Sequence, residues 1–310
     1  MPRFLHRLAA AALFIACLCP GNARAQDSSP LPAKEKFHLF LLVGQSNMAG
    51  RGLVATEDRT PHPRVLMLNQ AGEWVPAIDP LHFDKPAAVG VGLGKSFAVQ
   101  IAEANPGITV GLIPCAVGGS PIDSWKPGVF YPPTKSYPWD DALKRARLAL
   151  KAGVLKGILW HQGESDSHAP LASAYEPKLH DLIARLRQEL DAPDVPFIAG
   201  QMGVFADAPW DNARKQVDQA HRDLPGKVAR TAFVSAAGLT HKGDKVHFDA
   251  ASYRELGRRY AEALLKLSSR KSDRAFLPPA SAARRVRRPR GDTPAPQCPS
   301  RGSRFRRAPS

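Results

Sequence analysis

A serine and a histidine from opposite ends of the sequence have the neighbours that nucleophilic catalysis needs. Ser46 is the central residue of the segment Gly-Gln-Ser-Asn-Met at 44–48, which directly follows an apolar run. His247 closes the segment Asp-Lys-Val-His, which begins at Asp244. A serine hydroxyl is a weak nucleophile until a base accepts its proton, and an imidazole serves best when a carboxylate orients it. These three residues therefore predict acyl transfer through a serine.

Two glycine-containing segments lie between them in the sequence and offer hydrogen-bond donors. Val-Gly-Gly-Ser occupies 117–120, and Trp-His-Gln-Gly-Glu-Ser-Asp occupies 160–166. A tetrahedral oxyanion is stabilised by donors that are already in place, and glycine lets the backbone approach a substrate closely. The expected donors of this oxyanion hole are the backbone N–H of Ser46, the N–H of Gly118 or Gly119, and the side-chain amide of Gln162.

The second of these segments adds a carboxylate that competes with Asp244 for the histidine. Glu164 is the alternative partner of His247. We favour Asp244 because Asp-x-x-His is the commoner arrangement and folds back within a single turn. Beside the serine, Gln45 and Asn47 are expected to shape the turn that carries the nucleophile.

Each of these residues also has an interpretation without catalysis. Ser46 suits the N-cap of a helix, and an isolated histidine or glycine pair is more often structural. The local cluster of His241, Asp244, His247 and Asp249 has no spacing typical of zinc sites, so no metal is expected. The sequence has neither G-x-G-x-x-G nor a P-loop, so no cofactor is expected. The presence of all the segments in one chain favours catalysis.

Alternating apolar runs and amphipathic stretches predict the elements that must position these residues. Continuous apolar runs are typical of parallel strands covered on both faces, and their alternation with helices predicts an α/β fold with a doubly wound sheet. The predicted strands are 37–43, 65–68, 108–114, 157–161 and 197–201, with a short sixth at 232–235, and the predicted helices are 93–104, 139–152, 172–190, 210–223 and 250–267.

The segments that carry chemistry have a consistent place relative to these elements. Three of them each follow a predicted strand, and the Asp-x-x-His segment precedes the last helix. In a doubly wound sheet, ligands bind at the edge formed by the carboxyl ends of the strands. All four segments are therefore expected to meet at that edge.

With these four segments in this order, the sequence resembles the SGNH (GDSL-type) hydrolases. More narrowly, it is similar to the group of sialate O-acetylesterases and carbohydrate esterase family 6, which includes acetylxylan esterases. The superfamily usually has an oxyanion-hole asparagine where this chain has Gln162, as is typical of the esterase 6 group. The matching residues are Gly-Gln-Ser-Asn-Met at 44–48, Gly-Gly-Ser-x-Ile with a following Trp at 118–125, Trp-His-Gln-Gly-Glu-Ser-Asp at 160–166 and Asp-x-x-His at 244–247.

The resemblance implies a three-layer α/β/α sandwich of the flavodoxin-like kind, with a five-stranded parallel sheet. It also implies a secreted serine esterase, without a cofactor, that removes O-acetyl groups from acetylated xylan, another polysaccharide or O-acetyl sialic acid. The absence of a G-x-S-x-G segment argues against an α/β-hydrolase. Two alternatives stay open: a short-chain lipase or arylesterase with the same machinery, and a non-catalytic carbohydrate- or surface-binding protein on the same fold.

The first residues of the chain have the composition of a targeting segment. Residues 1–25 combine basic residues, an apolar run and Ala-Arg-Ala, which predicts a signal peptide cleaved near Ala25 and a secreted or periplasmic protein. The apolar run is too short to span a bilayer comfortably, so no transmembrane segment is expected. Cys17, at the end of Phe-Ile-Ala-Cys, leaves a lipid anchor as a minor alternative.

The end of the chain carries most of its positive charge. The formal net charge is +15, and residues 270–310 hold 12 Lys and Arg against 2 Asp and Glu, with many Pro and Ser. Such a composition predicts disorder, and it suits contact with anionic surfaces. The remaining body is nearly neutral, so no nucleic-acid partner is required. The expected organisation is a signal peptide at 1–25, a short linker at 26–35, an SGNH-type esterase domain at 36–268 and a basic tail at 269–310.

Overall fold

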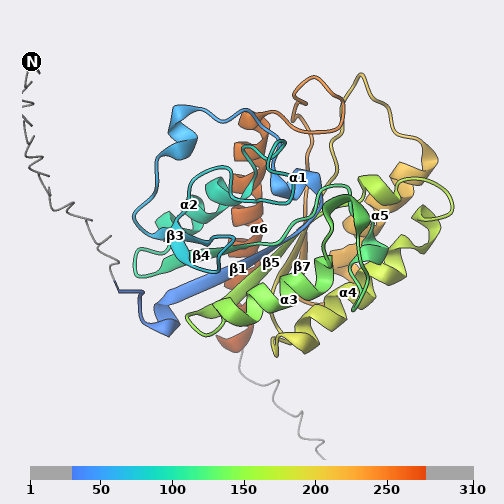
Figure 1. Cartoon of the computed structure of the whole chain (residues 1–310). Helices are drawn as coiled ribbons and strands as arrows, with labels where there is room; N and C mark the ends of the chain where they lie inside the picture. Colours follow the sequence, from blue (N-terminus) through green and yellow to red (C-terminus); the bar gives the residue numbers. More distant parts are fainter. Residues whose placement is uncertain (1–29, 277–310) are drawn as a thin grey trace, which may run out of the picture. The chain divides into compact units, whose positions relative to one another are not determined.

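The computed structural model describes residues 30–276, in which seven strands form one sheet with helices on both faces (Figure 1). The predicted signal peptide, Cys17 and most of the basic tail lie outside the described residues. The strands are β1 (Phe37–Gly44), β2 (Val65–Leu68), β3 (Trp74–Pro76), β4 (Thr109–Pro114), β5 (Val154–His161), β6 (Phe197–Gly200) and β7 (Thr231–Val234). The α-helices are α1 (Ser46–Ala49), α2 (Gly94–Ala104), α3 (Pro138–Ala149), α4 (Tyr175–Glu189), α5 (Asn212–Lys227) and α6 (Ala250–Phe276), and the 3-10 helices are η1 (Lys34–Lys36), η2 (Thr56–Arg59), η3 (Ile122–Ser124), η4 (Pro132–Thr134), η5 (Glu164–Asp166) and η6 (Ala172–Ala174).

The strand that precedes Ser46 lies inside the sheet. The strand order is β3-β2-β4-β1-β5-β6-β7, and all neighbours pair in parallel except β2 and β3. Every residue of β1 except His38 is buried, because helices cover both faces of the strand. This explains why its sequence is a continuous apolar run. β1 is flanked by β4 and β5, the strands that lead into the two glycine-containing segments.

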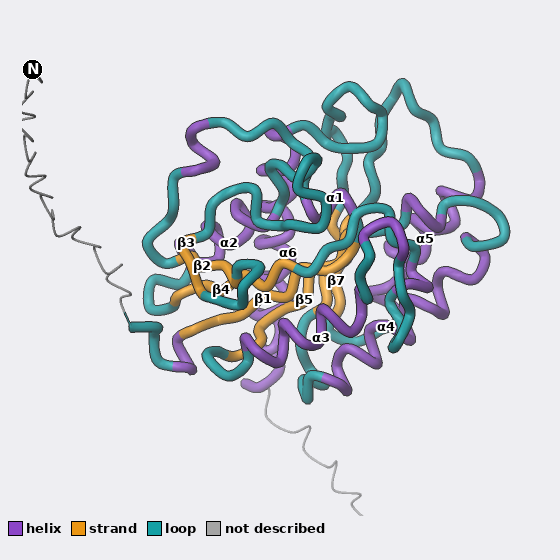
Figure 2. The backbone as a smooth tube through the Cα atoms, viewed as in Figure 1, coloured by secondary structure: helices purple, strands orange, loops and turns teal. Residues whose placement is uncertain are grey.

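The two faces of β1 contact different helices, which gives the three layers seen in Figure 2. Phe37, Leu39 and Leu41 pack with side chains of α3, α4 and α5. Phe40 and Leu42 pack with side chains of α2 and α6. The division follows from the two-residue period of a strand, whose side chains point alternately to opposite faces.

The predicted α/β sandwich is confirmed, but the predicted five-stranded sheet is too small. The structure adds β7, which corresponds to the short sixth strand of the sequence analysis, and β3, which has no counterpart there. β3 has only three residues, Trp-Val-Pro, all at least partly exposed, so it is too short for the sequence pattern to reveal a strand. β3 is also antiparallel to β2, so the sheet is mixed at this edge.

The predicted helices all occur, with one clear difference in length. α6 continues to Phe276, beyond the predicted end at 267 and into residues assigned by composition to the basic tail. No helix within residues 30–276 is long and apolar enough to cross a bilayer.

The carboxyl ends of β1, β4 and β5 are tied to one another by backbone hydrogen bonds. β1 leads through Gln45 into α1, whose first residue is Ser46. Gln45 N–H donates to His161 O at 2.9 Å, and Val117 N–H donates to Gly44 O at 2.9 Å. The sheet therefore brings three of the four chemical segments to one edge, as the strand pattern predicts.

Candidate active site

The side chains of Ser46, His247 and Asp244 form a continuous hydrogen-bonded chain. His247 Nε2 lies 2.9 Å from Ser46 Oγ, and His247 Nδ1 lies 2.7 Å from Asp244 Oδ2. Ser46 is 8% exposed, whereas the His247 and Asp244 side chains are 23% and 36% exposed. The serine is therefore almost fully buried, whereas the histidine and the aspartate are partly exposed to solvent.

A short turn between Asp244 and His247 orients the imidazole. Asp244 Oδ1 accepts the backbone N–H of Val246 at 3.0 Å and that of His247 at 2.8 Å. Burial raises the pKa of the Asp244 carboxyl, but the hydrogen bonds from His247 and Val246 outweigh burial and hold this pKa well below its usual value. Asp244 is therefore ionised at neutral pH. It favours the tautomer with the proton on His247 Nδ1 and a lone pair on Nε2 that faces Ser46.

Asn47 connects the serine turn to the histidine loop. Its Nδ2 donates to Glu164 Oε1 at 2.6 Å and to Val246 O at 3.0 Å, and its Oδ1 accepts the Tyr253 hydroxyl at 2.6 Å. Asn47 is fully buried, so these bonds are made away from water. The residue after the serine thereby links α1 to the loop that carries the imidazole.

Glu164, the alternative partner of the histidine, lies elsewhere in the site. Its Oε1 accepts a hydrogen bond from Asn47 Nδ2, and its Oε2 is buried without a partner among the described residues. Of the two carboxylates, Asp244 is therefore the one hydrogen-bonded to His247, and Glu164 is bonded to Asn47 in the serine turn. Gln45, also expected to shape this turn, accepts the Ser165 N–H at 3.3 Å through its side-chain oxygen.

Two of the expected oxyanion donors have no acceptor within the protein. Among residues 30–276, neither Ser46 N–H nor Gly119 N–H makes a hydrogen bond. Gly118 N–H instead donates to Asp84 Oδ2 at 2.7 Å, and Arg51 Nη2 donates to the same oxygen at 3.0 Å. A Cβ at position 118 would lie 2.4 Å from Arg51 Nη2 and 2.7 Å from Asp84 Oδ2, so a larger residue there would displace this buried ion pair. Of the two glycines, Gly119 has the available N–H.

The amide of Gln162 is fully buried and engaged inside the protein, which corrects the expectation from sequence. Its Nε2 donates to Ser120 O at 3.2 Å and to Asp166 Oδ2 at 2.5 Å. Its Oε1 accepts the Tyr175 hydroxyl at 2.7 Å. Both amide protons are thus used, and neither is left for a substrate oxygen. Gln162 contacts the turn that carries Gly119 instead.

The sequence from 36 to 266 matches the family model described as carbohydrate esterase, sialic acid-specific acetylesterase. The chain belongs to this family. It is therefore a carbohydrate esterase, as the four segments predict. A probable carbohydrate esterase of Arabidopsis thaliana is 31% identical over 268 residues, which cover 80% of this chain and 96% of that protein.

Solved structures are similar to this esterase over most of its length. The crystal structure of an Arabidopsis thaliana protein has a TM-score of 0.65 and 30% identity, covering 74% of this chain and 98% of that one. The structure of NanS has a TM-score of 0.64 and 18% identity, covering 77% of this chain and all of its own. A carbohydrate acetylesterase from Xanthomonas citri has a TM-score of 0.59 and 18% identity, covering 74% of this chain and 56% of its own. The last two share the fold.

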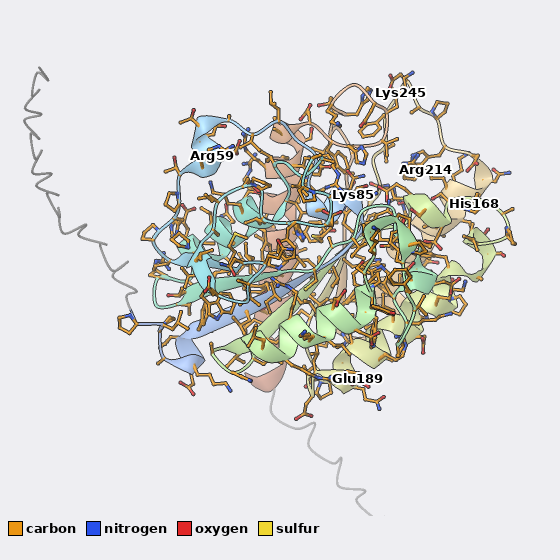
Figure 3. The ribbon with its side chains drawn as sticks, in the orientation of Figure 1. Arg59, Lys85, His168, Glu189, Arg214 and Lys245 are labelled. Atoms are coloured by element: carbon orange, nitrogen blue, oxygen red, sulfur yellow. The ribbon has the colours of Figure 1, made fainter. Side chains whose placement is uncertain are left out.

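Two residues near the candidate site, Asp84 and Lys85, are not indicated by any sequence motif. Asp84 holds Gly118, as described above, and its neighbour in the sequence is Lys85, which is labelled in Figure 3. Lys85 Nζ is 3.9 Å, and Tyr131 Oη 3.1 Å, from the position that a Cβ on Gly119 would occupy. Both side chains therefore lie close to Gly119. They lie in loops whose path the sequence does not predict.

The other members of the local His/Asp cluster have separate partners. His241 Nε2 lies 3.2 Å from both carboxylate oxygens of Asp207. Asp249 Oδ1 accepts the Ser252 N–H at 2.8 Å, at the start of α6. In the part of the chain that the structure describes, no group of three or more His, Cys, Asp or Glu is arranged to hold a metal ion.

Proposed function

We propose that this esterase removes O-acetyl groups from carbohydrate through a Ser-His-Asp mechanism. Ser46 is the nucleophile, His247 transfers the proton, and Asp244 orients the imidazole and stabilises its charged form. The observation that carries the proposal is the 2.9 Å contact between Ser46 Oγ and His247 Nε2, from residues 201 positions apart in the sequence. The second bond, from His247 Nδ1 to Asp244, supports the same assignment.

In the first half-reaction, His247 Nε2 accepts the hydroxyl proton of Ser46 while Oγ attacks the acetyl carbonyl carbon. The carbonyl oxygen becomes negatively charged and accepts hydrogen bonds from the N–H groups of Ser46 and Gly119. The bond between the carbonyl carbon and the sugar oxygen then breaks, and the imidazolium protonates that oxygen. The sugar leaves, and the acetyl group stays on Ser46.

In the second half-reaction, a water molecule attacks the acetyl-serine. His247 accepts a proton from the water, and the same two N–H groups bind the oxyanion. The intermediate collapses, acetate leaves, and the imidazolium returns its proton to Ser46 Oγ. Asp244 remains ionised throughout, consistent with its lowered pKa.

Replacing the proposed nucleophile separates this function from a non-catalytic one. Ser46→Ala is expected to abolish acetate release and to leave sugar binding largely intact, because only one small side chain is lost. Full acetate release by the variant would refute the nucleophile assignment. No acetate release by the wild-type enzyme from any acetylated glycan, with binding retained, would favour the sugar-binding alternative.

The side chains beside Gly119 suggest how the sugar is held. Lys85 is half-buried, and its ammonium forms no ion pair with the described residues. Burial raises the pKa of the Tyr131 hydroxyl, which therefore stays protonated and can donate a hydrogen bond. A cation and a phenol suit a carboxylated sugar such as sialic acid, and the phenol alone suits neutral xylan. Acetate release from a panel of acetylated glycans distinguishes the two substrate classes.

A cavity of about 440 Å³ at the carboxyl ends of β2 and β4 borders the same turn. Asp84 lines this cavity and also accepts the N–H of Gly118. Phe83, Ser136 and Arg145 form other parts of its wall, a mixture of aromatic and polar groups that suits a sugar ring. We therefore expect acetylated oligosaccharides to be better substrates than the matching monosaccharides. Equal kcat/KM for both would show that the cavity does not bind a neighbouring sugar.

The alternative of a short-chain lipase or arylesterase is tested by the length of the acyl group. Acetylated sugars are expected to be hydrolysed faster than sugars with longer acyl chains and faster than aryl esters of longer acids. The reverse order would favour that alternative.

Export of the esterase stays a prediction from the first 25 residues. The mature protein recovered outside the cytoplasm is expected to begin near Gln26, the residue after Ala25. N-terminal sequencing of the exported protein tests this, and an intact N-terminus would contradict it.

A further inference from the structure

We propose that Ser165 and Gln162 are positioning residues that hold the N–H of Gly119 in place for the oxyanion. Two further buried side chains, Tyr175 and His221, support Gln162. This inference rests on the proposed function, because it concerns the same acyl transfer. None of these side chains donates to the substrate oxygen. They act through the backbone that does.

Three consecutive peptide groups around Gly119 differ in their partners. In the first, the N–H of Gly118 donates to Asp84 at 2.7 Å. In the third, Gly119 O accepts the Ser165 hydroxyl at 2.8 Å, and Ser120 N–H donates within the turn at 3.2 Å. The middle group, between the two glycines, makes no hydrogen bond with any described residue. Its N–H is thus flanked by fixed peptide groups and left free for a ligand.

A turn with two adjacent glycines needs such restraints. Gly119 has a φ of 84°, in the left-handed region, and glycine adopts several other backbone conformations at low cost. Without a partner on its carbonyl, the peptide group after Gly119 can rotate and change the direction of the neighbouring N–H. The Ser165 hydroxyl selects the rotation observed here, in which this N–H has no acceptor within the described protein.

Gln162 fixes the next carbonyl of the same turn. Its Nε2 donates to Ser120 O, and also to Asp166 Oδ2, which accepts the Ile122 N–H at 2.9 Å. Both contacts at this end of the amide are acceptors, so this end must be the NH₂ group and the other end the oxygen. The Gln162 amide is therefore linked to the chain on both sides of Pro121: directly to Ser120 O, and through Asp166 to the N–H of Ile122.

The orientation of the Gln162 amide determines where the protons lie on the next two buried groups, the Tyr175 hydroxyl and the His221 imidazole. Gln162 Oε1 can only accept, so the Tyr175 hydroxyl donates to it at 2.7 Å. Having used its one proton, the Tyr175 oxygen accepts from Trp160 Nε1 at 3.2 Å and from His221 Nε2 at 2.9 Å. Burial lowers the pKa of His221 to about 3, so its imidazole is neutral with the proton on Nε2. A proton-ordered chain thus runs from α5 through α4 to the glycine turn.

Two nearby serines provide a matched test. The hydroxyls of Ser165 and Ser167 each donate to a backbone carbonyl at 2.8 Å, that of Gly119 and that of Gly163 respectively. Ser165→Ala is expected to lower kcat roughly 10–100-fold with KM nearly unchanged, a smaller loss than the ~10²–10³ for removing an oxyanion donor outright. Ser167→Ala is expected to leave kcat unchanged.

Reaction of Ser46 with a fluorophosphonate gives a second readout. The reagent places an oxygen in the oxyanion hole without involving the sugar, so its rate reports on the oxyanion N–H groups and the Ser46–His247 pair without any contribution from sugar binding. We expect this rate to fall in Ser165→Ala in the same proportion as kcat. Ser165→Thr, which keeps the hydroxyl, is expected to restore both quantities. Tyr175→Phe is expected to lower kcat by less, because Gln162 retains its bonds to Ser120 and Asp166.

Equal kcat values for Ser165→Ala and Ser167→Ala would overturn the positioning role, and so would a rise in KM alone. A folded Ser165→Thr variant with the same loss as Ser165→Ala would also overturn it, because the hydroxyl would then not be the cause. Undiminished acetate release by Ser46→Ala would instead overturn the proposed function. The two failures are therefore distinguishable.

Discussion

Asp244→Asn is expected to move the proton of the His247 imidazole from Nδ1 to Nε2 and to preserve the turn between Asp244 and His247. The asparagine oxygen still accepts the two backbone N–H groups that Oδ1 accepts now. Its NH₂ group takes the place of the oxygen that lies 2.7 Å from His247 Nδ1. A donor facing Nδ1 favours the tautomer with the proton on Nε2, and that tautomer offers Ser46 no lone pair.

The size of the loss follows from two contributions. The charge-assisted bond to the imidazolium contributes about 1.5–3 kcal/mol. In the variant, the reactive tautomer with the proton on Nδ1 has the Nδ1–H facing the asparagine NH₂ group. These two donors cannot bond to each other, and this costs about 1–3 kcal/mol. Together they predict a fall in kcat of roughly 10²–10⁴-fold. The partial exposure of both side chains, 36% and 23%, places the expected value toward the lower end.

Acetate release measured as kcat and KM near neutral pH is the appropriate assay. Asp244→Ala is expected to lose less than Asp244→Asn, because it removes the bond without imposing the wrong tautomer. Glu164→Gln serves as the control carboxylate, since Glu164 contacts Asn47 rather than His247. A larger loss of kcat in Glu164→Gln than in Asp244→Asn would mean that Glu164, and not Asp244, orients the histidine.

Three further predictions concern stability and specificity. Burial raises the pKa of Asp79 from 3.8 to about 7. The folded state therefore holds a proton that the unfolded chain releases, and stability falls as the pH rises between these values, by about 4 kcal/mol at most. Asp79→Asn should raise the melting temperature above pH 7 and have little effect below pH ~4; an equal effect at both pH values would contradict this. Tyr253→Phe leaves the buried Asn47 oxygen without its donor and should cost about 1–3 kcal/mol in denaturant unfolding, with a neutral result arguing against that bond. Lys85→Met should raise KM for a carboxylated acetyl sugar more than for a neutral one, and equal changes would exclude a charge-recognition role.

The sequence predicts which segments meet because strands and residue types carry that information. A buried strand before Ser46 and another before the Gly-Gly pair place both at one sheet edge, whatever the details of the loops. The Asp-x-x-His spacing likewise suffices for a one-turn contact, and the structure has that contact at 2.7 Å.

The individual hydrogen bonds of the oxyanion region could not be predicted in the same way. Which glycine has a free N–H depends on Asp84, which reaches Gly118 from a loop 34 positions earlier without any motif. Whether the Gln162 amide faces outward depends on acceptors that become its neighbours only on folding. Such contacts are set by loop paths, which residue periodicity does not describe.

Capture of the acyl group on the enzyme is the most direct test of the proposed chemistry. The wild-type protein is mixed with an acetylated sugar, quenched with acid during turnover and digested for peptide mass spectrometry. One acetyl group is expected on Ser46, and none on the same peptide of Ser46→Ala. Acetate release without an acetyl group on Ser46, or with one on another residue, would contradict the proposed chemistry.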